Sequence, residues 1–399
     1  MEKLYEDLLG LANLRVHRVE LSTRDIRIYC EVNEGNTCPS CGKLTTTINQ
    51  RYERIVRDLS ISGRRVFLHL SVKQYECQNC GRMHSQVFNF LSKGKSYTDR
   101  QAKWIFEMSK KQCHTEVAVL LDMNAKTVEN IFYSQAEKQV KSVDWTKIRR
   151  IGIDEFAFKK GHKDFILILL DLATHEIIAL LPFRDKVNII SFFHSLGDEF
   201  CKQVEVYSSD MWQPFLDIGA EIFPNAQVVI DRFHWTNHLN KVLDNTRKDL
   251  RQIDKDNAAF KYLKWTLVKR PEHLKAKEKQ VLEEALEAAK AFEKTTPLAQ
   301  IYEIKNELIT IFDTNFSFEM GKLEVEFWIK KAEIIDNKHL NKFVKLLRKN
   351  FTNIINYFHD RVSNAVVEGT NNLLRTIKRV TYNMSNFEHF KARVFAWKS

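Results

Sequence analysis

Two Cys-x-x-Cys pairs constrain the fold of this chain more than any other feature of its sequence. The pairs read CPSCG at residues 38–42 and CQNCG at residues 77–81, and each ends in a glycine. Four thiolates in two such knuckles can close a tetrahedral Zn²⁺ site, and a glycine after the second cysteine accepts the unusual φ angle of the turn. We therefore predict one structural zinc ion, whose ligands are Cys38, Cys41, Cys77 and Cys80.

Other interpretations of these cysteines stay open. The chain has seven cysteines, an odd number, and the pairing is local, so a disulfide framework is a poor alternative. Buried turn cysteines without metal are a better one, and His84 is an alternative ligand. The spacer between the pairs exceeds the roughly 15–20 residues usual in a zinc ribbon. Alternating runs at 54–59 and 65–75, with a turn at Gly63, predict a β-hairpin that fills it.

Residues 115–138 have the pattern of a helix, a tight turn and a second helix. Val117, Val119, Leu120 and Leu121 are predicted to pack the first helix, and Val128 and Ile131 to anchor the second. This is the spacing of a helix-turn-helix, whose second helix enters the major groove of DNA. Two helices of an ordinary bundle give a similar pattern and are the alternative. The second helix offers side chains for DNA contact, namely Lys126, Thr127, Asn130 and Lys138.

Strands and helices alternate after residue 148. Three strand-like runs at 150–158, 165–170 and 177–181 are separated by short turns, which predicts an antiparallel meander. A helix, a strand, a helix and a strand follow, a succession typical of strands added in parallel, at residues 188–200, 204–208, 214–222 and 227–230. The order βββαβαβ is that of an RNase H-like fold. Residues 235–360 lack convincing strands, so we predict a large helical insertion before the last helix.

Three acidic residues fall where this topology would bring them together. Asp154 lies in the first strand (GIDEF), Asp210 at the end of the fourth (YSSDMW) and Glu368 in the last helix (SNAVVEGTNN). The first and fourth strands of an RNase H-like sheet are neighbours, and the last helix packs against them. Converging carboxylates repel one another unless cations lie between them, and two Mg²⁺ ions about 3.5–4 Å apart would serve phosphoryl transfer. Each residue alone has a simpler interpretation, such as a helix cap or a salt bridge.

The last predicted helix has two different sides. One side carries an apolar stripe at helical spacing, formed by Val366, Thr370, Leu373, Ile377 and Val380. The other carries Glu368 together with amide and basic side chains, namely Asn371, Asn372, Arg375 and Arg379, with Lys378 beside them. A carboxylate for metal, with Arg and Asn for phosphates, suits a surface that faces DNA. A solvated face would explain the charges but not the paired asparagines.

The net charge of +11 is concentrated near the C-terminus. Residues 341–399 contain eleven Lys or Arg and three acidic residues. A basic segment favours a polyanionic partner, because binding to phosphates releases counterions, although a solvated helix face is the alternative. The longest apolar stretch, residues 165–170, is far shorter than the roughly 20 residues of a membrane helix, and the N-terminus is acidic where a signal peptide is basic. We therefore expect a cytoplasmic protein that binds no membrane.

Several of these segments resemble, in order and spacing, the transposases of the ISL-three type of bacterial insertion sequence. They are GIDEFAFKKGHKDF, SSDMWQPF, IDRFHW and SNAVVEGTNNLLRTIKRVTYNMSNFEHFKARV, and the cysteine pairs followed by a helix-turn-helix resemble that family too. The resemblance covers nearly the whole chain. It implies DDE transposition, in which the enzyme cleaves transposon ends and joins the freed 3′-hydroxyls to target DNA.

The resemblance also implies roles for particular residues. Asp154, Asp210 and Glu368 would hold two Mg²⁺ or Mn²⁺ ions, and Asp231 and His234 (DRFH) would have an auxiliary active-site role. A core or capping function is the alternative for His234. The implied partners are double-stranded DNA of the terminal inverted repeats and of the target, bound by a homodimer or higher multimer. The implied location is the bacterial cytoplasm, in association with the nucleoid.

The expected fold class is α/β, with an RNase H-like mixed sheet, a large all-α insertion, and a zinc ribbon and helix-turn-helix before them. The expected parts are a zinc ribbon, a helix-turn-helix domain, the first part of the catalytic core, the insertion, and the C-terminal part of the core, at residues 1–95, 96–147, 148–240, 241–355 and 356–399. Two other functions stay open. One is a transposase-derived DNA-binding regulator, against which the intact acidic triad argues. The other is a structure-specific nuclease on the same fold, which hydrolyses without joining.

Overall fold

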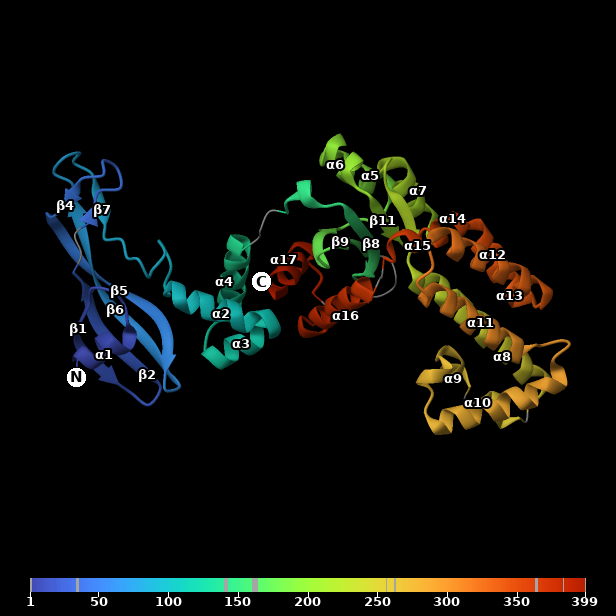
Figure 1. The fold of residues 1–399 in the computed structure, drawn as a ribbon. Helices are drawn as coiled ribbons and strands as arrows, with labels where there is room; N and C mark the ends of the chain where they lie inside the picture. Colours follow the sequence, from blue (N-terminus) through green and yellow to red (C-terminus); the bar gives the residue numbers. More distant parts are fainter. Residues whose placement is uncertain are drawn as a thin grey trace. The chain divides into compact units, whose positions relative to one another are not determined.

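The computed structural model divides the chain into two compact units. It describes all residues except 1, 34–35, 140–142, 160–163, 256, 262, 363–364, 383 and 399, and the side chains of 36, 365–368 and 398. One unit comprises Met1–Lys141 and Leu374–Ser399, and the other Ser142–Leu373 (Figure 1). Each unit contains a five-stranded sheet and several helices, so the chain is a mixed α/β protein. Of the helices described, none is long and apolar enough to cross a membrane.

The sheet of the first unit has one apolar face. Its strands are β1 (Leu14–Leu21), β2 (Asp25–Val32), β5 (Ile48–Ile61), β6 (Arg64–Glu76) and β7 (Met83–Ser85). They lie in the order β1-β2-β6-β5, and β7 also pairs with β6. The long β5–β6 hairpin turns at Ser62 and Gly63, both with positive φ, and confirms the hairpin predicted between the cysteine pairs. Ile28, Val56 and Leu68 are fully buried in its core, against which α1 (Glu2–Leu9) packs.

Three helices follow this sheet, namely α2 (Asp99–Lys111), α3 (His114–Leu121) and α4 (Ala125–Gln139). The side chain of Cys113 caps the start of α3. Asp122 ends this helix in the left-handed conformation, with φ of 49°, and so makes a tight turn into α4. The two helices share a core with α2 through Val117, Val128 and Ile131. The helix, turn and helix predicted at residues 115–138 are therefore present. Val119 and Leu120 do not pack this core as predicted, because they lie on the outer side of α3 and are exposed.

The C-terminal helix α17 (Phe387–Lys398) packs against α2 and α4. Its Arg393 is only 1% exposed and donates hydrogen bonds to the carbonyl oxygens of Ser109 and Gln112 and to Nε2 of His114 (3.2 Å). Burial, together with the adjacent guanidinium, lowers the pKa of His114 to about 4, so this imidazole is neutral at pH 7 and can accept the bond. A helix from the far end of the sequence thus completes the helical part of the first unit.

Replacing Arg393 by methionine is expected to lower the free energy of unfolding of the first unit by about 3 kcal/mol, because the buried carbonyl of Ser109 and two partly buried acceptors lose a charged donor. Urea unfolding of the intact chain measures the effect. Lys391→Met, at a half-buried position on the same helix, is the control and should change the unfolding free energy little. Equal stability of Arg393→Met and the wild type would contradict this account.

A fragment that ends at residue 147 lacks α17 and with it Arg393, so it is expected to be unstable for the same reason.

The second unit contains a mixed sheet in the order β10-β9-β8-β11-β12. Its strands are β8 (Arg150–Ala157), β9 (Phe165–Asp171), β10 (Glu176–Leu181), β11 (Val206–Ser209) and β12 (Gln227–Ile230). The first three pair antiparallel, β11 pairs parallel with β8, and β12 pairs parallel with β11. These pairings confirm the predicted meander and the predicted parallel additions.

The two faces of this sheet have different neighbours. Ile151 packs with Phe193 and other apolar residues of the helices on one face, which are α5 (Lys186–Ser195), α6 (Asp198–Gln203) and α7 (Gln213–Ile222) (Figure 1). On the other face Val206 packs with Val362. The single helix predicted at 188–200 is divided between α5 and α6, because Gly197 has a φ of 93° and interrupts it.

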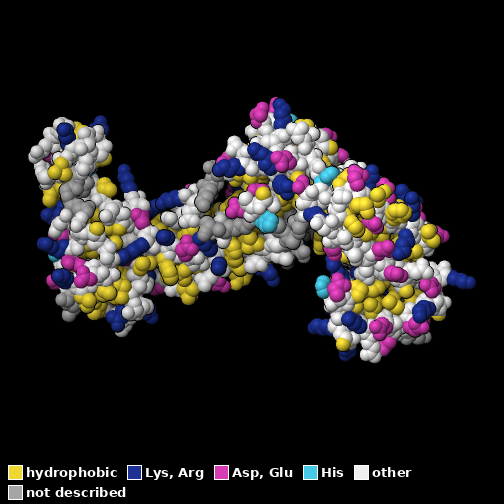
Figure 2. Space-filling model, viewed as in Figure 1, with side chains coloured by type: hydrophobic (Ala, Val, Ile, Leu, Met, Phe, Trp, Pro, Cys, Tyr) yellow, Lys and Arg dark blue, Asp and Glu magenta, His cyan; other side chains and the backbone are white. Residues whose placement is uncertain are grey.

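A succession of helices with its own core, at the place of the predicted insertion, follows β12. No strand occurs in the described part of residues 235–360, as predicted. The helices from here to the end of the unit are α8 (Arg232–Ile253), α9 (Lys264–Val268), α10 (Ala276–Ala289), α11 (Leu298–Asp313), α12 (Phe318–Ile334), α13 (Lys338–Lys349), α14 (Phe351–Ile355), α15 (Tyr357–Asp360) and the start of α16 (Ala365–Val380). Trp235, Phe312 and Trp328 are buried at the centre of the insertion. Figure 2 shows hydrophobic side chains at the surface over α12, where Phe327 and Ile334 are exposed.

Candidate functional site

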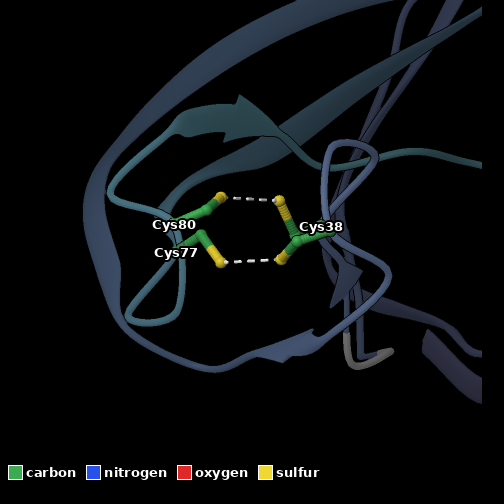
Figure 3. A group of neighbouring side chains, drawn as sticks. Cys38, Cys77 and Cys80 are labelled. Atoms are coloured by element: carbon green, nitrogen blue, oxygen red, sulfur yellow. Dashed lines mark hydrogen bonds between the residues drawn. The ribbon is translucent and has the colours of Figure 1, made fainter.

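The four cysteines of the two knuckles lie together (Figure 3). The Sγ atoms of Cys38 and Cys80 are 3.6 Å apart, those of Cys41 and Cys77 are 3.5 Å apart, and all four lie within 4.8 Å of one another. Sulfur ligands of a tetrahedral zinc ion, with Zn–S bonds of ~2.3 Å, are about 3.8 Å from one another. The four sulfurs therefore fit a zinc ion, and His84 is not part of this group.

Both knuckles have the same backbone geometry. The N–H of Gly42 donates to the carbonyl of Cys38 (2.9 Å), and the N–H of Gly81 donates to that of Cys77 (2.7 Å). Both glycines have φ close to +70°, in the left-handed region that favours glycine. The backbone N–H of Cys80 is the main cause that lowers the pKa of Cys77 to about 6, so this thiol ionises readily. The thiolate is the form that binds metal.

Two of the predicted acidic residues stand side by side on neighbouring strands. Ser208 of β11 pairs with Gly152 of β8. Asp210 directly follows β11, and the same register, continued for two residues, sets it beside Asp154, whose pKa the charge of Asp210 raises. Paired residues of adjacent parallel strands project from the same face of a sheet, about 4.8 Å apart. The sheet topology thus brings these two carboxylates to one place.

Asp231 extends this row to the next strand. Ser209 pairs with Ile230, so that Asp231 lies beside Asp210 directly after β12. The side chain of Asp231 is buried and caps the N-terminus of α8, and Nε2 of His234, one turn into that helix, is 3.4 Å from its Oδ2. Three aspartates therefore follow one line across β8, β11 and β12.

The row faces away from helices α5–α7. Ile153 packs with those helices, and successive side chains of a strand alternate, so its neighbour Asp154 projects from the opposite face. Val206 and Val229, which precede Asp210 and Asp231 by an even number of residues, also face that side. This is the face on which the start of α16 meets the sheet, through a hydrogen bond to Asp154.

Asp154 is nearly buried, with 9% of its surface exposed. Its Oδ1 accepts a hydrogen bond from the N–H of Glu155 (2.8 Å) and its Oδ2 accepts one from Nδ2 of Asn371 (2.6 Å). Burial raises the pKa of Asp154 to about 6 and the charge of Asp210 adds to the rise, while the bond from Asn371 and the charge of His234 oppose it. A cation in this place would favour the ionised carboxylate.

The third predicted acid cannot be placed in the same way. Glu368 belongs to α16, and its side chain lies outside the described part of the structure. Among the described side chains, the four cysteines are the one group of three or more ligands within reach of a single ion. Near Asp154 and Asp210, the amide oxygen of Asn371 is buried and no described residue forms a hydrogen bond with it. Carboxylate and amide oxygens are the ligands of hard divalent cations, so these residues fit Mg²⁺.

The predicted DNA contacts come from two helices. On α4, Lys126 and Asn130 are exposed and Thr127 is half-buried. Lys126 forms an ion pair with Glu129 (2.9 Å). On α16 the predicted contacts include Asn372, Arg375, Lys378 and Arg379. Lys378 is half-buried and the other three are exposed. Asn371 differs from them, because its amide bonds to Asp154.

Two features near the aspartates were not predicted from the sequence. The first is the bond from Asn371, a residue whose sequence pattern indicates phosphate recognition instead. Its position three residues after Glu368 is the signal that could have revealed it, since residues three apart share a helix face. The second is Arg184, which pairs with Glu155 (2.9 Å) and lies 4.0 Å from the ring centre of Phe165. No pattern in the sequence indicates that contact.

Two family models match this chain, one over its cysteine pairs and the other over most of the rest of the sequence. A family model described as transposase, of the DDE and ISL3 type, matches residues 151–394, and one described as zinc-finger of transposase IS204/IS1001/IS1096/IS1165 matches residues 34–80. The transposase for insertion sequence element IS1001 of Bordetella parapertussis is 26% identical in an alignment 404 residues long that covers 99% of this chain and 97% of that protein. The transposase for insertion sequence element IS1557 of Mycobacterium tuberculosis is 26% identical in an alignment 300 residues long that covers 67% of this chain and 64% of that protein.

The transposase model spans more than half of the chain, including β8, β11, β12 and α16, and the zinc-finger model covers the two cysteine pairs. Both agree with the resemblance identified from the sequence motifs. The chain therefore belongs to the ISL3 family of DDE transposases and is an enzyme of an insertion sequence, with a four-cysteine cluster suited to zinc at its N-terminal sheet.

Proposed function

We propose that this transposase cleaves the ends of its insertion sequence and joins them to target DNA with two divalent cations, Mg²⁺ or Mn²⁺, held by Asp154, Asp210 and Glu368. The observation that carries the proposal is the pairing of β8 with β11, which sets Asp210 beside Asp154 on the face that meets α16. Glu368 precedes Asn371 by three positions in that helix. When bound, such cations activate the attacking hydroxyl and stabilise the leaving oxygen.

The chain's own groups would orient these ligands. The N–H of Trp212 donates to Oδ1 of Asp210 (2.9 Å), and the N–H of Glu155 donates to Oδ1 of Asp154, so neither carboxylate rotates freely. Asp231 and His234 are candidates for an auxiliary role, because their row continues that of the ligands. Capping of α8 by Asp231 is the simpler function that its hydrogen bonds support.

We further infer that the second unit is an RNase H-like catalytic core interrupted by the helical insertion, since its strand order and the succession of its elements follow that pattern. The zinc ribbon and the helix-turn-helix would recognise double-stranded DNA of the terminal inverted repeats. On α4, Lys126, Thr127 and Asn130 would enter a major groove. The basic residues of α16 would bind phosphates of end or target DNA. A homodimer or larger assembly is expected, because two ends must reach one target.

A strand-transfer assay tests this function. The purified chain is incubated with labelled terminal-repeat DNA and a supercoiled target plasmid in Mg²⁺, and products are separated under denaturing conditions. We expect both nicked ends and ends covalently joined to the plasmid, and neither product in EDTA. Cut ends without joined product would instead indicate a nuclease. Binding of the ends without either product would indicate a DNA-binding regulator.

A further inference from the structure

We propose that Asn371 is a positioning residue for the metal ligand Asp154, with its amide oxygen turned to the cation site, and that it is not a contact to DNA phosphate. The inference rests on the proposed function of Asp154. Asn371 lies on α16, and its Nδ2 donates to Oδ2 of Asp154 over 2.6 Å. This bond joins α16 to the row of aspartates.

Two hydrogen bonds from described residues orient Asp154 and leave its carboxylate able to bind a cation. One N–H donor reaches each carboxylate oxygen, from the backbone of Glu155 on Oδ1 and from Asn371 on Oδ2. An ionised carboxylate oxygen has two lone pairs, so each oxygen keeps the capacity for one further partner. Donors on both oxygens fix the orientation of the carboxylate plane. Residues that orient a metal ligand in this way raise the affinity of the site for metal.

The other end of the Asn371 amide gives an independent observation. Its Oδ1 is buried and has no hydrogen-bond partner among the described residues. Buried polar atoms in folded proteins nearly always have a partner, so such an atom requires one that the protein itself does not supply. Amide oxygens are ligands of hard divalent cations. The neighbouring carboxylates of Asp154 and Asp210 indicate the kind of partner, because they would bring a cation to this place.

A contact to DNA would require a different environment. Asn372, Arg375 and Arg379 of the same helix are exposed to solvent, where DNA phosphates would approach. Asn371 instead directs its amide group at a nearly buried carboxylate, and the hydrogen that it donates there is not given to a phosphate. The two asparagines that the sequence presents as a pair therefore have separate functions.

The experiment measures Mn²⁺ binding to the intact protein without DNA, by the loss of the electron paramagnetic resonance signal of free Mn²⁺. Asn371→Ala is expected to weaken Mn²⁺ binding by about 10–100-fold, the usual effect of removing a residue that orients a metal ligand. The Mg²⁺ concentration for half-maximal end cleavage should rise by a similar factor. Asn225→Ala is the matched control, since the amide of Asn225 bonds to the carbonyl of Lys202 on an exposed loop. It should change neither quantity.

Two outcomes separate a failure of this inference from a failure of the proposed function. If the wild type binds Mn²⁺, Asp154→Asn weakens that binding and Asn371→Ala does not, the role of Asn371 is overturned while the proposed function stands. A raised KM for end DNA with an unchanged Mg²⁺ requirement also overturns the role of Asn371 alone. If the wild type binds no Mn²⁺, the proposed function itself fails. Should thermal unfolding show that the alanine variant is destabilised, Asn371→Leu, which resembles asparagine in shape, must show the same loss of Mn²⁺ affinity.

Discussion

Asp154→Asn, Asp210→Asn and Glu368→Gln are each expected to reduce end cleavage and joining by about 10³-fold or more. Each substitution keeps the size of the side chain and removes the negative charge that a hard divalent cation requires. Loss of a ligand displaces at least one cation. The rate of cleavage falls about tenfold for each 1.4 kcal/mol of transition-state stabilisation that is lost, so a loss of several kcal/mol gives the expected effect. Cleavage of end DNA by each variant in Mg²⁺ provides the measurement.

Binding to end DNA should survive in these variants, because we attribute it to the first unit and to the basic residues of α16. Glu155→Gln is the matched control. Glu155 follows Asp154 directly, but by strand alternation it projects from the other face, where it pairs with Arg184. It should keep near wild-type activity. A rate close to wild type for Glu368→Gln would mean that the active site is assigned wrongly, and equal losses in Glu155→Gln would mean that these substitutions act through folding.

Cys77→Ser is expected to lower the zinc content from about one ion per chain to near zero. Binding of zinc by four cysteines contributes directly to the folding of the segment that carries them. We expect the affinity for end DNA to fall toward that for random DNA, which for a typical specific protein is about 10³-fold weaker or more. Metal analysis of protein purified without chelator measures the first effect, and competition binding at fixed salt measures the second.

Cys201→Ser is the control for this substitution. Cys201 is buried at α6 in the second unit, where its thiol lies near the carbonyl of Phe193, and it has no part in the four-cysteine group. It should retain one zinc ion and normal affinity for the ends. Full zinc content in Cys77→Ser would contradict the assignment of the ligands.

Local patterns predicted much of the fold. The alternating runs of the β5–β6 hairpin and of the β8–β9–β10 meander are short-range signals, and the structure confirms both. The aspartates were identifiable for a similar reason, because Asp210 and Asp231 each follow a short apolar strand directly. Parallel strands that end at the same level then bring such residues into one row.

Contacts between distant segments could not be predicted. Arg393 contributes to the basic C-terminal segment that favours a polyanionic partner, yet it is buried against α2 and bonds to main-chain carbonyls. Nothing in its local sequence distinguishes it from Arg379, which is exposed. The bond between Asn371 and Asp154 also depends on how α16 meets the sheet. The five-part domain division and the residue roles drawn from the family resemblance stay predictions.

The most direct test of the metal centre is a change of metal specificity in Asp210→Cys. A thiolate is a softer ligand than a carboxylate and favours Mn²⁺ over Mg²⁺. If Asp210 binds a catalytic cation, this variant should be inactive in Mg²⁺ and regain end cleavage in Mn²⁺, whereas the wild type should cleave with either metal. Asp217→Cys, on α7 where Asp217 bonds to Gln213, should behave as the wild type. Equal losses of activity in the two metals for Asp210→Cys would contradict the proposal that this residue binds a metal ion.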